Sequence, residues 1–361
     1  MKPTQRLHEL GQSLWLDNIT RTMLDDGTLQ RYVAELSVTG LTSNPTIFDK
    51  AITESDAYDE RIVDCQARGV SPEETFFELA IADLRRAADL FADVHARTDG
   101  IDGWVSLEVS PLLADDAART IEQATGLHET AERQNLYVKI PGTDAGRSAI
   151  EEAVFAGIPI NVTLLFSTEH YLGAAEAYMR GLERRIEAGL DPALGSVASL
   201  FISRWDAAVG EEAPEELRDE LGIAVAKRTY GAYRDLLDSE RWQRLANEGA
   251  RPQRLLWAST GTKDPEASDV LYIERLAAPH TVNTMPEKTL LAFAEHGAVG
   301  EPLPADGGDS ERVLAAFAEA GVDVDELATR LQSEGAAAFV ASWQDLTSSI
   351  RAEAERLAPA G

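Results

Sequence analysis

The chain has 361 residues and a net charge of −29, with 44% hydrophobic and 26% charged residues. This length is enough for one large barrel or two ordinary domains, and the composition is typical of a soluble protein with a sizeable core. Because so negative a protein repels nucleic acid and anionic lipid, neither is expected as a partner.

Cysteine usage, histidine spacing and hydropathy narrow the class of protein further. Cys65 is the only cysteine, which excludes a disulfide framework and a thiolate metal site, and the histidines are scattered without an H-E-x-x-H arrangement. No apolar run approaches the length of a membrane span, and the first residues lack the apolar region of a signal peptide. We therefore expect a cytoplasmic protein that uses no metal.

Short apolar runs alternate with helical segments along most of the chain. The pattern predicts helices over 3–12, 28–38, 56–68, 71–97, 114–134, 146–157, 168–189, 213–248 and 266–277. It predicts strands over 13–19, 40–48, 103–111, 136–142, 158–166, 195–203, 254–262 and 281–285, the second of them interrupted by Ser43-Asn44-Pro45.

Eight short strands that alternate with helices predict an α/β fold, a single (β/α)8 or TIM barrel. Such barrels use about 250 residues, so the surplus is predicted to form extra helices at the N-terminus, after the second strand and at the C-terminus. We expect residues 1–361 to form one domain in which 300–361 is a C-terminal helical extension packed on the barrel. In its last helix one apolar face is predicted to make that contact, through Phe339, Trp343, Leu346 and Ile350.

A lysine stands in the middle of the fourth predicted strand. Lys139 lies between Val138 and Ile140, and a lysine is almost never fully buried unless it is paired. Burial favours the neutral amine, which is a nucleophile that forms Schiff bases with carbonyl compounds. The alternative is an ion pair with a nearby carboxylate, and this strand alone leaves both interpretations open.

In the other predicted strands the polar residues stand at every second position, as expected of side chains that point into the barrel lumen. Side chains of a barrel strand alternate between the lumen and the surrounding helices, and active sites of this fold lie at the C-terminal strand ends. Unpartnered buried polar groups are costly, so core packing explains these residues poorly. They are Asp17, Thr42, Asn44, Ser106, Glu108, Ser110, Asn161, Thr163, Ser259 and Lys263.

Several of these segments resemble the signature segments of transaldolases. The resemblance implies transfer of a dihydroxyacetone unit, without a cofactor, from sedoheptulose 7-phosphate to glyceraldehyde 3-phosphate in the non-oxidative pentose phosphate pathway, giving erythrose 4-phosphate and fructose 6-phosphate. The region from Val322 to Leu331 resembles the longer bacterial branch. The signature segments are Trp15-Leu16-Asp17-Asn18, Thr42-Ser43-Asn44-Pro45, Ser106-Leu107-Glu108-Val109-Ser110, Val138-Lys139-Ile140-Pro141, Ile160-Asn161-Val162-Thr163, and Ser199-Leu200-Phe201 with Arg204.

The resemblance also implies roles for individual residues. Lys139 would form the Schiff base, Asp17 would exchange a proton with the C4 hydroxyl, and Glu108 with Thr163 would hold the water that imine formation needs. The residues alone leave simpler roles open, in which Asp17 is a structural partner of Asn18 or Arg21 and Glu108 only neutralises Lys139. The implied substrate-binding residues are Thr42, Asn44, Asn161, Ser199, Phe201, Arg204 and Lys263. Each of the first four could instead be only a strand-end cap.

The phosphate end of the site departs from the family pattern. Arg204 matches the anchor of the family, whereas Lys263 stands where better-known branches carry arginine. Both residue types bind phosphate, arginine in a bidentate manner and lysine as a point charge.

Three other functions stay open at this point. A Schiff-base aldolase that releases dihydroxyacetone from fructose 6-phosphate would use nearly the same lysine and barrel, although such enzymes resemble shorter transaldolases. A metal-dependent barrel enzyme would need a cluster of histidines or carboxylates at the strand ends. A silent barrel that binds sugar phosphates would need Arg204 and Lys263 but not Lys139. The sequence leaves the oligomeric state open between monomer and homodimer.

Overall fold

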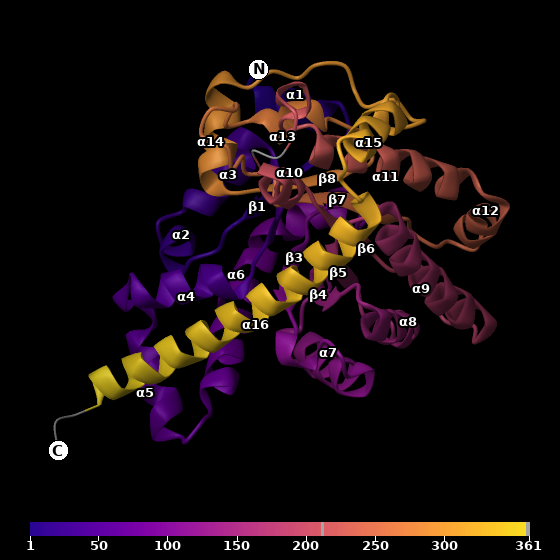
Figure 1. Ribbon diagram of the computed structural model, residues 1–361. Helices are drawn as coiled ribbons and strands as arrows, with labels where there is room; N and C mark the ends of the chain where they lie inside the picture. Colours follow the sequence, from indigo (N-terminus) through magenta and orange to yellow (C-terminus); the bar gives the residue numbers. More distant parts are fainter. Residues whose placement is uncertain (211–212, 359–361) are drawn as a thin grey trace.

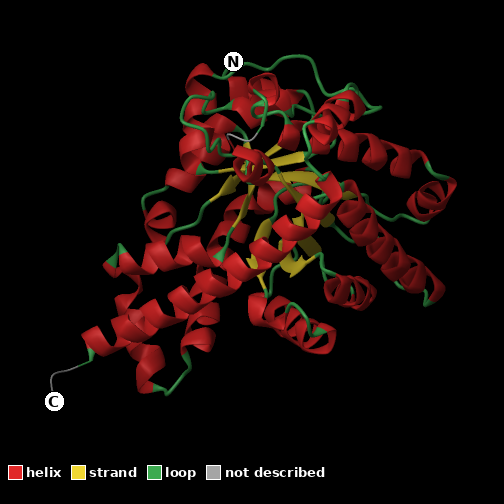
Figure 2. Ribbon diagram, in the orientation of Figure 1, coloured by secondary structure: helices red, strands yellow, loops and turns green. Residues whose placement is uncertain are grey.

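A computed structural model describes residues 1–210 and 213–358. Parallel strands stand around one lumen in the order β2-β1-β8-β7-β6-β5-β4-β3, and helices surround them (Figure 1, Figure 2). The prediction of a (β/α)8 barrel is thereby confirmed. The strands are β1 (Ser13–Asp17), β2 (Val38–Thr42), β3 (Val105–Glu108), β4 (Leu136–Pro141), β5 (Ile160–Leu165), β6 (Ser196–Phe201), β7 (Gln253–Ala258) and β8 (Val282–Met285).

The sheet closes on itself between β2 and the residues that lead into β3. The N–H of Leu41 donates to the carbonyl of Trp104 at 2.9 Å, and the N–H of Gly103 donates to the carbonyl of Thr39 at 2.9 Å. This close approach needs a glycine at position 40, because a Cβ there would lie 2.6 Å from the carbonyl oxygen of Trp104. Closure leaves no edge strand exposed.

Helices follow most strands, and additional helices are inserted after β2 and at both ends of the chain. The sequence pattern does not predict α2, α10, α14 or α15, and it predicts one long helix where α11 and α12 stand. The helices are α1 (Pro3–Glu9), α2 (Arg21–Asp25), α3 (Thr28–Leu36), α4 (Pro45–Thr53), η1 (Asp56–Tyr58), α5 (Asp59–Ala67), α6 (Pro72–Arg97), η2 (Pro111–Leu113), α7 (Ala117–Ala131), α8 (Asp144–Ala156), α9 (Thr168–Glu187), α10 (Ser203–Val209), η4 (Glu215–Leu217), α11 (Leu221–Asp238), α12 (Glu240–Asn247), α13 (Leu271–Arg275), α14 (Glu287–His296), α15 (Ser310–Glu319) and α16 (Val324–Leu357).

The second predicted strand is wrong beyond Thr42, because the chain turns there into α4. Asn44 is the N-cap of this helix, and its Oδ1 accepts a hydrogen bond from the N–H of Ile47 at 3.1 Å. Pro45 occupies the first helical position, where its missing N–H and fixed φ are no handicap. The Asn-Pro pair that interrupts the apolar pattern is therefore a helix start.

Alternate strand residues enter two different cores. Val138 and Ile140 of β4 belong to the core between strands and helices, whereas Tyr137 belongs to a second core inside the lumen. There the ring of Tyr137 stacks on Trp104 with centroids 4.0 Å apart, and Trp15 lies 6.1 Å from Tyr137. The predicted alternation is confirmed, and Tyr137 lies one inward-facing position before Lys139 on β4.

The long helix α16 crosses the molecule as the yellow helix in the foreground of Figure 1 and runs past α4 and α5. Its Trp343 packs against Phe76 and Phe77 of α6, with ring centroids 5.1 Å and 5.6 Å away. The predicted apolar face therefore covers helices inserted after β2, while Phe339 of the same face reaches the mouth of the barrel. The last residues of the predicted extension, 359–361, lie outside the described residues.

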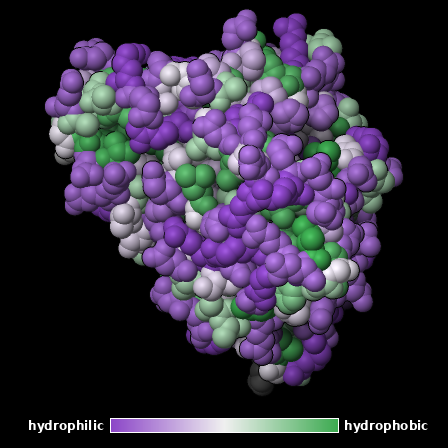
Figure 3. Space-filling model, turned by 90° about the vertical axis from the view of Figure 1, so that its right-hand side faces the viewer, coloured by the Kyte–Doolittle hydropathy of each residue, from purple (hydrophilic) through white to green (hydrophobic). Residues whose placement is uncertain are grey.

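The outer surface reflects the acidic composition. On the side seen in Figure 3 hydrophilic residues predominate and the hydrophobic ones form separate patches. Arginines offset part of the negative charge, as where Arg241 lies 2.7 Å from Glu183 and Arg184 lies 2.6 Å from Glu152. None of the described helices is both long and apolar enough to cross a membrane.

Candidate active site

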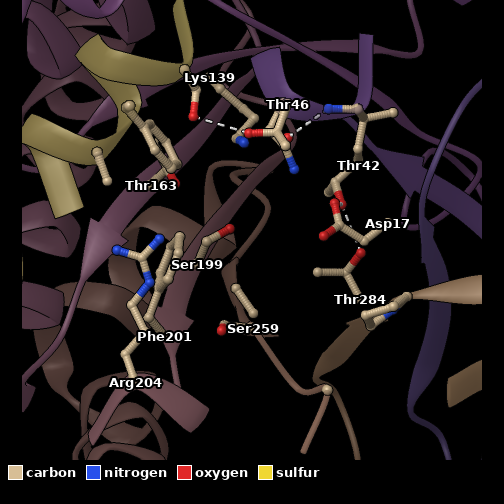
Figure 4. A pocket seen from close by; sticks show the side chains of 18 of the residues that line it. Asp17, Thr42, Thr46, Lys139, Thr163, Ser199, Phe201, Arg204, Ser259 and Thr284 are labelled. Atoms are coloured by element: carbon tan, nitrogen blue, oxygen red, sulfur yellow. Dashed lines mark hydrogen bonds between the residues drawn. The ribbon is translucent and has the colours of Figure 1, made fainter. Parts of the chain in front are cut away.

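A pocket with a volume of about 430 Å³ opens at the C-terminal ends of the strands. Figure 4 shows side chains from separate elements pointing into this one space. Two predicted site residues, Glu108 and Asn161, do not line the pocket but contact residues that do. The predicted residues that line it are Asp17, Thr42, Asn44, Lys139, Thr163, Ser199, Phe201, Arg204 and Lys263.

Lys139 is held by two acceptors inside the lumen. Its side chain is 7% exposed, and Nζ donates to Oε2 of Glu108 at 3.0 Å and to the carbonyl of Ser43 at 3.1 Å. The ring centroid of Phe339 lies 5.8 Å from Nζ. The ion pair that the sequence left as an alternative is therefore present. The pocket still reaches the amine, so the pair and a nucleophilic role are compatible.

Glu108 and Thr163 flank Lys139 on the neighbouring strands. Glu108 lies opposite Lys139 on β3, and Thr163 lies two residues beyond Asn161, which is opposite Lys139 on β5. Oε1 of Glu108 and Oγ1 of Thr163 are buried and have no hydrogen-bond partner within residues 1–210 and 213–358. Burial raises the pKa of Glu108, against the opposing effect of Lys139. Two orphaned oxygens beside an amine are suited to hold a polar ligand atom.

Asp17 ends β1 on another wall of the pocket, and a chain of hydroxyls orients it. Thr42 donates to Oδ1 of Asp17 at 2.8 Å, so the 2.7 Å bond between Thr42 and Thr284 has Thr284 as its donor. Burial raises the pKa of Asp17, while Lys139 and the bond from Thr42 oppose the rise. Oδ1 is thus fixed by the protein, and Oδ2 is left for a ligand.

The simpler role that the sequence left open for Asp17 is wrong. Asn18 donates from Nδ2 to Glu287 at 3.2 Å, and Arg21 pairs with Asp83 at 2.9 Å. Both suggested partners of Asp17 are therefore bonded elsewhere. The carboxylate of Asp17 is directed to the pocket and not into a structural ion pair.

A buried hydrogen-bonded relay supports the floor of the pocket. Asn161 is fully buried, donates from Nδ2 to Oγ of Ser106 at 3.2 Å, and accepts at Oδ1 from Ser199 at 2.7 Å. Asn161 thereby fixes Ser199, which lines the pocket. Asn44 also lines the pocket. Its Oδ1 caps α4, as the alternative role of a strand-end cap requires, and its NH2 group is left for a ligand.

Two of the predicted residues that line the pocket, Arg204 and Lys263, are cations. Arg204 lies in the first turn of α10, with its guanidinium carbon 5.2 Å from the ring centroid of Phe201. Burial lowers the pKa of Arg204, and Lys263 follows β7 on an exposed segment. Among the described residues neither cation has an ion-pair partner within 4.0 Å. In a chain of charge −29, two unpaired cations in one pocket favour an anionic ligand.

The helix α16 supplies one wall of the pocket. Phe339 and Ser342 line the pocket, and Ser342 accepts a hydrogen bond from Thr46 of α4 at 3.0 Å. Gln332 donates to the carbonyl of Leu164 near the end of β5 at 2.9 Å. These bonds tie α16 across the mouth, which brings Phe339 next to Lys139.

Thr284 and Lys50 are among the further pocket residues that lie outside the predicted site. Thr284 of β8 shares its parity with Val282, which packs in the lumen, so the alternation used for the other strands was signal enough to find it. Lys50 lies on α4, just beyond the end of the predicted second strand, and nothing in the sequence pattern connects it to the pocket. In the part of the chain that the structure describes, no group of three or more His, Cys, Asp or Glu side chains could hold a metal ion.

Comparisons with known proteins agree along almost the whole chain. A family model described as Transaldolase/Fructose-6-phosphate aldolase matches residues 14–350. A transaldolase of Frankia alni is 44% identical over 357 residues, which is 96% of each chain. Transaldolases of Thermobifida fusca and Kocuria rhizophila are each 45% identical, over 95% and 97% of this chain and 96% and 98% of their own. The similarity includes the barrel and most of α16.

Proposed function

The chain belongs to the transaldolase/fructose-6-phosphate aldolase family, and from this premise we propose that it is a transaldolase. It transfers a dihydroxyacetone unit from sedoheptulose 7-phosphate to glyceraldehyde 3-phosphate and gives erythrose 4-phosphate and fructose 6-phosphate. The observation that carries the proposal is Lys139, buried beside Glu108 in a pocket that Asp17 and Arg204 also line. The pathway is the non-oxidative pentose phosphate pathway.

The first step is an imine between Lys139 and C2 of the ketose. Nζ attacks the carbonyl carbon once its ammonium proton has passed to Glu108, 3.0 Å away, and the raised pKa of that buried carboxyl favours the transfer. The carbinolamine then loses water, with Glu108 and Thr163 as the groups that hold the water and relay its protons. Their orphaned oxygens support this role.

The second step breaks the bond between C3 and C4. Asp17 takes the proton of the C4 hydroxyl, the C4 oxygen forms the aldehyde, and the bonding electrons move into the protonated imine to leave an enamine on Lys139. The same groups then work in reverse with a new aldehyde, whose oxygen receives the proton from Asp17. Water finally hydrolyses the new imine and restores the amine.

Phosphate binding orients both the donor and the acceptor. Arg204 offers a planar fork for bidentate contact and Lys263 a second charge, and each is free of ion pairs among the described residues. Because the phosphate is remote from the reacting carbons, its binding energy can position the aldehyde for attack. This requirement favours phosphorylated acceptors.

The decisive experiment traps the imine. After incubation with fructose 6-phosphate and reduction with borohydride, we expect a mass adduct of one dihydroxyacetone unit on Lys139 and none on Lys50 or Lys263, which line the same pocket. Lys139→Met should show no adduct and no turnover. An unmodified Lys139 after exhaustive reduction would sink the mechanism.

A second trial separates the transferase from an aldolase, since the family description includes both activities. Erythrose 4-phosphate should strongly accelerate the consumption of fructose 6-phosphate by a transferase. Equal rates with and without this acceptor would identify the protein as an aldolase that releases dihydroxyacetone.

We also propose the wider setting of the enzyme. The chain forms one domain, and residues 300–358 form a C-terminal extension whose helix α16 lies across the mouth and along the helices inserted after β2. Small sugar phosphates are its ligands, and it acts in the cytoplasm without a cofactor, as a monomer or a homodimer. Size-exclusion chromatography with light scattering distinguishes these two states.

A further inference from the structure

A second cavity, with a volume of about 580 Å³, lies at the end of the barrel where the strands begin. Its lining includes Ser13 at the start of β1, Ser196 at the start of β6 and Arg254 near the start of β7. Asp17 ends β1 and Lys139 lies in the second half of β4, and both line the pocket at the other mouth of the barrel. The two cavities are therefore separate sites, and the mechanism proposed above uses nothing from this one.

One side of the cavity is apolar and aromatic. Tyr137 of β4, Tyr233 and Leu237 of α11, and Trp242 of α12 line it together. Tyr137, Tyr233 and Trp242 are each at least 95% buried, so their rings are held by the surrounding core. A rigid and largely apolar wall of this kind suits an apolar ring.

The other side carries a buried cation that no carboxylate neutralises. Arg254 is 7% exposed and donates to the carbonyls of Thr281 at 2.8 Å, Ile101 at 3.1 Å and His280 at 3.5 Å and to the hydroxyl of Ser13 at 2.7 Å. No carboxylate of the described residues lies within 4.0 Å of its guanidinium. Asp102, which also lines the cavity, is reached only through Ser13, and the other carboxylate of the lining belongs to Asp238. Buried charges are normally paired, so this one favours an anionic ligand.

Two more arginines extend the positive side. Arg251 lines the cavity, and its ion pair is a 3.5 Å contact to Asp99, whose side chain is 97% exposed. Arg234 also lines the cavity, and its buried Nε has no hydrogen-bond partner within residues 1–210 and 213–358. A weak exposed pair and an unused donor leave both groups available to an anion.

A buried acceptor completes the site. Gln12 is fully buried and lines the cavity, with its Nε2 donating to the carbonyl of Leu276 and to Thr281, both at 2.8 Å. Its Oε1 receives no hydrogen bond from any described residue. An orphaned acceptor of this kind is costly unless a donor satisfies it. A ligand hydroxyl or N–H would supply that donor.

We infer that this cavity binds a small organic anion, a carboxylate on an apolar ring that also carries a hydroxyl or N–H donor. The ring lies against the aromatic wall, the carboxylate meets Arg251 and Arg254, and the donor reaches Gln12. The site has no part in Schiff-base chemistry, so it stands whether or not the protein proves to be a transaldolase.

The test uses 4-hydroxybenzoate as the probe and calorimetric titration of the full chain as the measurement. We expect saturable binding at one site, and binding at least about tenfold weaker for 4-hydroxybenzamide, which keeps the ring and the hydroxyl but lacks the charge. Leu237→Trp, which fills the cavity from a half-buried position, should abolish binding. Arg251→Gln should weaken it by about tenfold.

The matched control removes an arginine from the other mouth. Arg204→Gln should leave the affinity for 4-hydroxybenzoate unchanged, and circular dichroism should show that all three variants are folded. Equal affinities for the benzoate and the benzamide would overturn the anion site. Loss of binding in Arg204→Gln, or unaltered binding in both Leu237→Trp and Arg251→Gln, would place the probe elsewhere and end the proposal.

Discussion

The two mouths of the barrel bury carboxylates in opposite ways. Near the strand starts, Oδ2 of Asp102 accepts a hydrogen bond from Ser13. Its Oδ1 accepts two more, from the indole N–H of Trp15 at 2.8 Å and from the backbone N–H of Gly103 at 3.1 Å. At the strand ends Glu108 has one oxygen bonded to Lys139 and the other without a partner among the described residues. A carboxylate whose oxygens are both bonded holds a structure together, and one with a free oxygen can do chemistry.

The same contrast holds for Asp17, which shares β1 with Trp15. Thr42 occupies only Oδ1 of Asp17, and burial raises the pKa of its carboxyl as it does for Glu108. Perturbed carboxyls in a cleft are typical of functional sites, although structural networks also produce them. In this protein the hydrogen bonds distinguish the two kinds of carboxylate, because both oxygens of Asp102 are bonded while Asp17 and Glu108 each keep one oxygen for a ligand.

The largest expected effects come from the two carboxylates of the reactive mouth. Asp17→Asn should leave the borohydride adduct intact while cleavage slows, because only cleavage needs the C4 hydroxyl proton removed. Glu108→Gln should slow adduct formation itself. Each loss should be about 10²–10⁴-fold, measured by single-turnover trapping beside steady-state rates. The reverse pattern, with trapping lost in Asp17→Asn and kept in Glu108→Gln, would mean that the two roles are exchanged.

A smaller effect is expected at the phosphate end of the same mouth. Arg204→Ala removes a charge-assisted contact worth about 1.5–3 kcal/mol, so kcat/KM for phosphorylated substrates should fall about 10- to 100-fold. Turnover of dihydroxyacetone with an unphosphorylated aldehyde should change little. Lys263→Ala should act in the same direction but more weakly, because a point charge is lost without a bidentate fork. Equal losses of kcat/KM for phosphorylated and unphosphorylated substrates would show that Arg204 and Lys263 do not bind the phosphate.

Much of this site followed from one rule, the alternation of side chains along a strand. Lys139, Asp17 and Glu108 lie in the lumen because inward positions of adjacent strands converge at one mouth. The same rule applied to β8 would have found Thr284. The resemblance to a known family supplied the roles, which no spacing of residues could give.

Residues on helices escaped that rule for a physical reason. Lys50 and Phe339 reach the pocket from α4 and α16, and the register of a strand says nothing about where a helix lies across the mouth. The position of α16 depends on tertiary bonds such as Gln332 to the carbonyl of Leu164. An apolar stripe on a helix predicts burial but not the partner, so the pattern alone does not separate Phe339, which lies near Lys139, from Trp343, which packs on α6.

Removing the ring of Phe339 should change the ratio of dihydroxyacetone release to transfer several-fold. Phe339→Ala should admit water to the enamine, so that release of dihydroxyacetone rises relative to transfer, because the ring lies 5.8 Å from Nζ of Lys139. Ile350→Ala removes a buried side chain of the same helix far from the pocket, and it should lower stability without altering the partition. The partition is measured as dihydroxyacetone released per erythrose 4-phosphate consumed. An unchanged ratio in Phe339→Ala would exclude the ring as the barrier to water.

The smallest effect is on stability, and its sign should differ between the two mouths. A carboxyl whose pKa is raised in the folded state binds its proton more tightly there, so its contribution to stability is greatest below the ordinary pKa of aspartate and is lost as pH rises through the raised value. Asp17→Asn removes that loss and should raise the Tm at pH 7 by a few degrees, with the gain shrinking toward pH 4. Asp102→Asn breaks a satisfied network and should lower the Tm at pH 7. Thermal unfolding of both variants at pH 7 and pH 4 measures these changes in Tm. A fall in Tm for Asp17→Asn at pH 7 would mean that the carboxylate of Asp17, like that of Asp102, stabilises the fold.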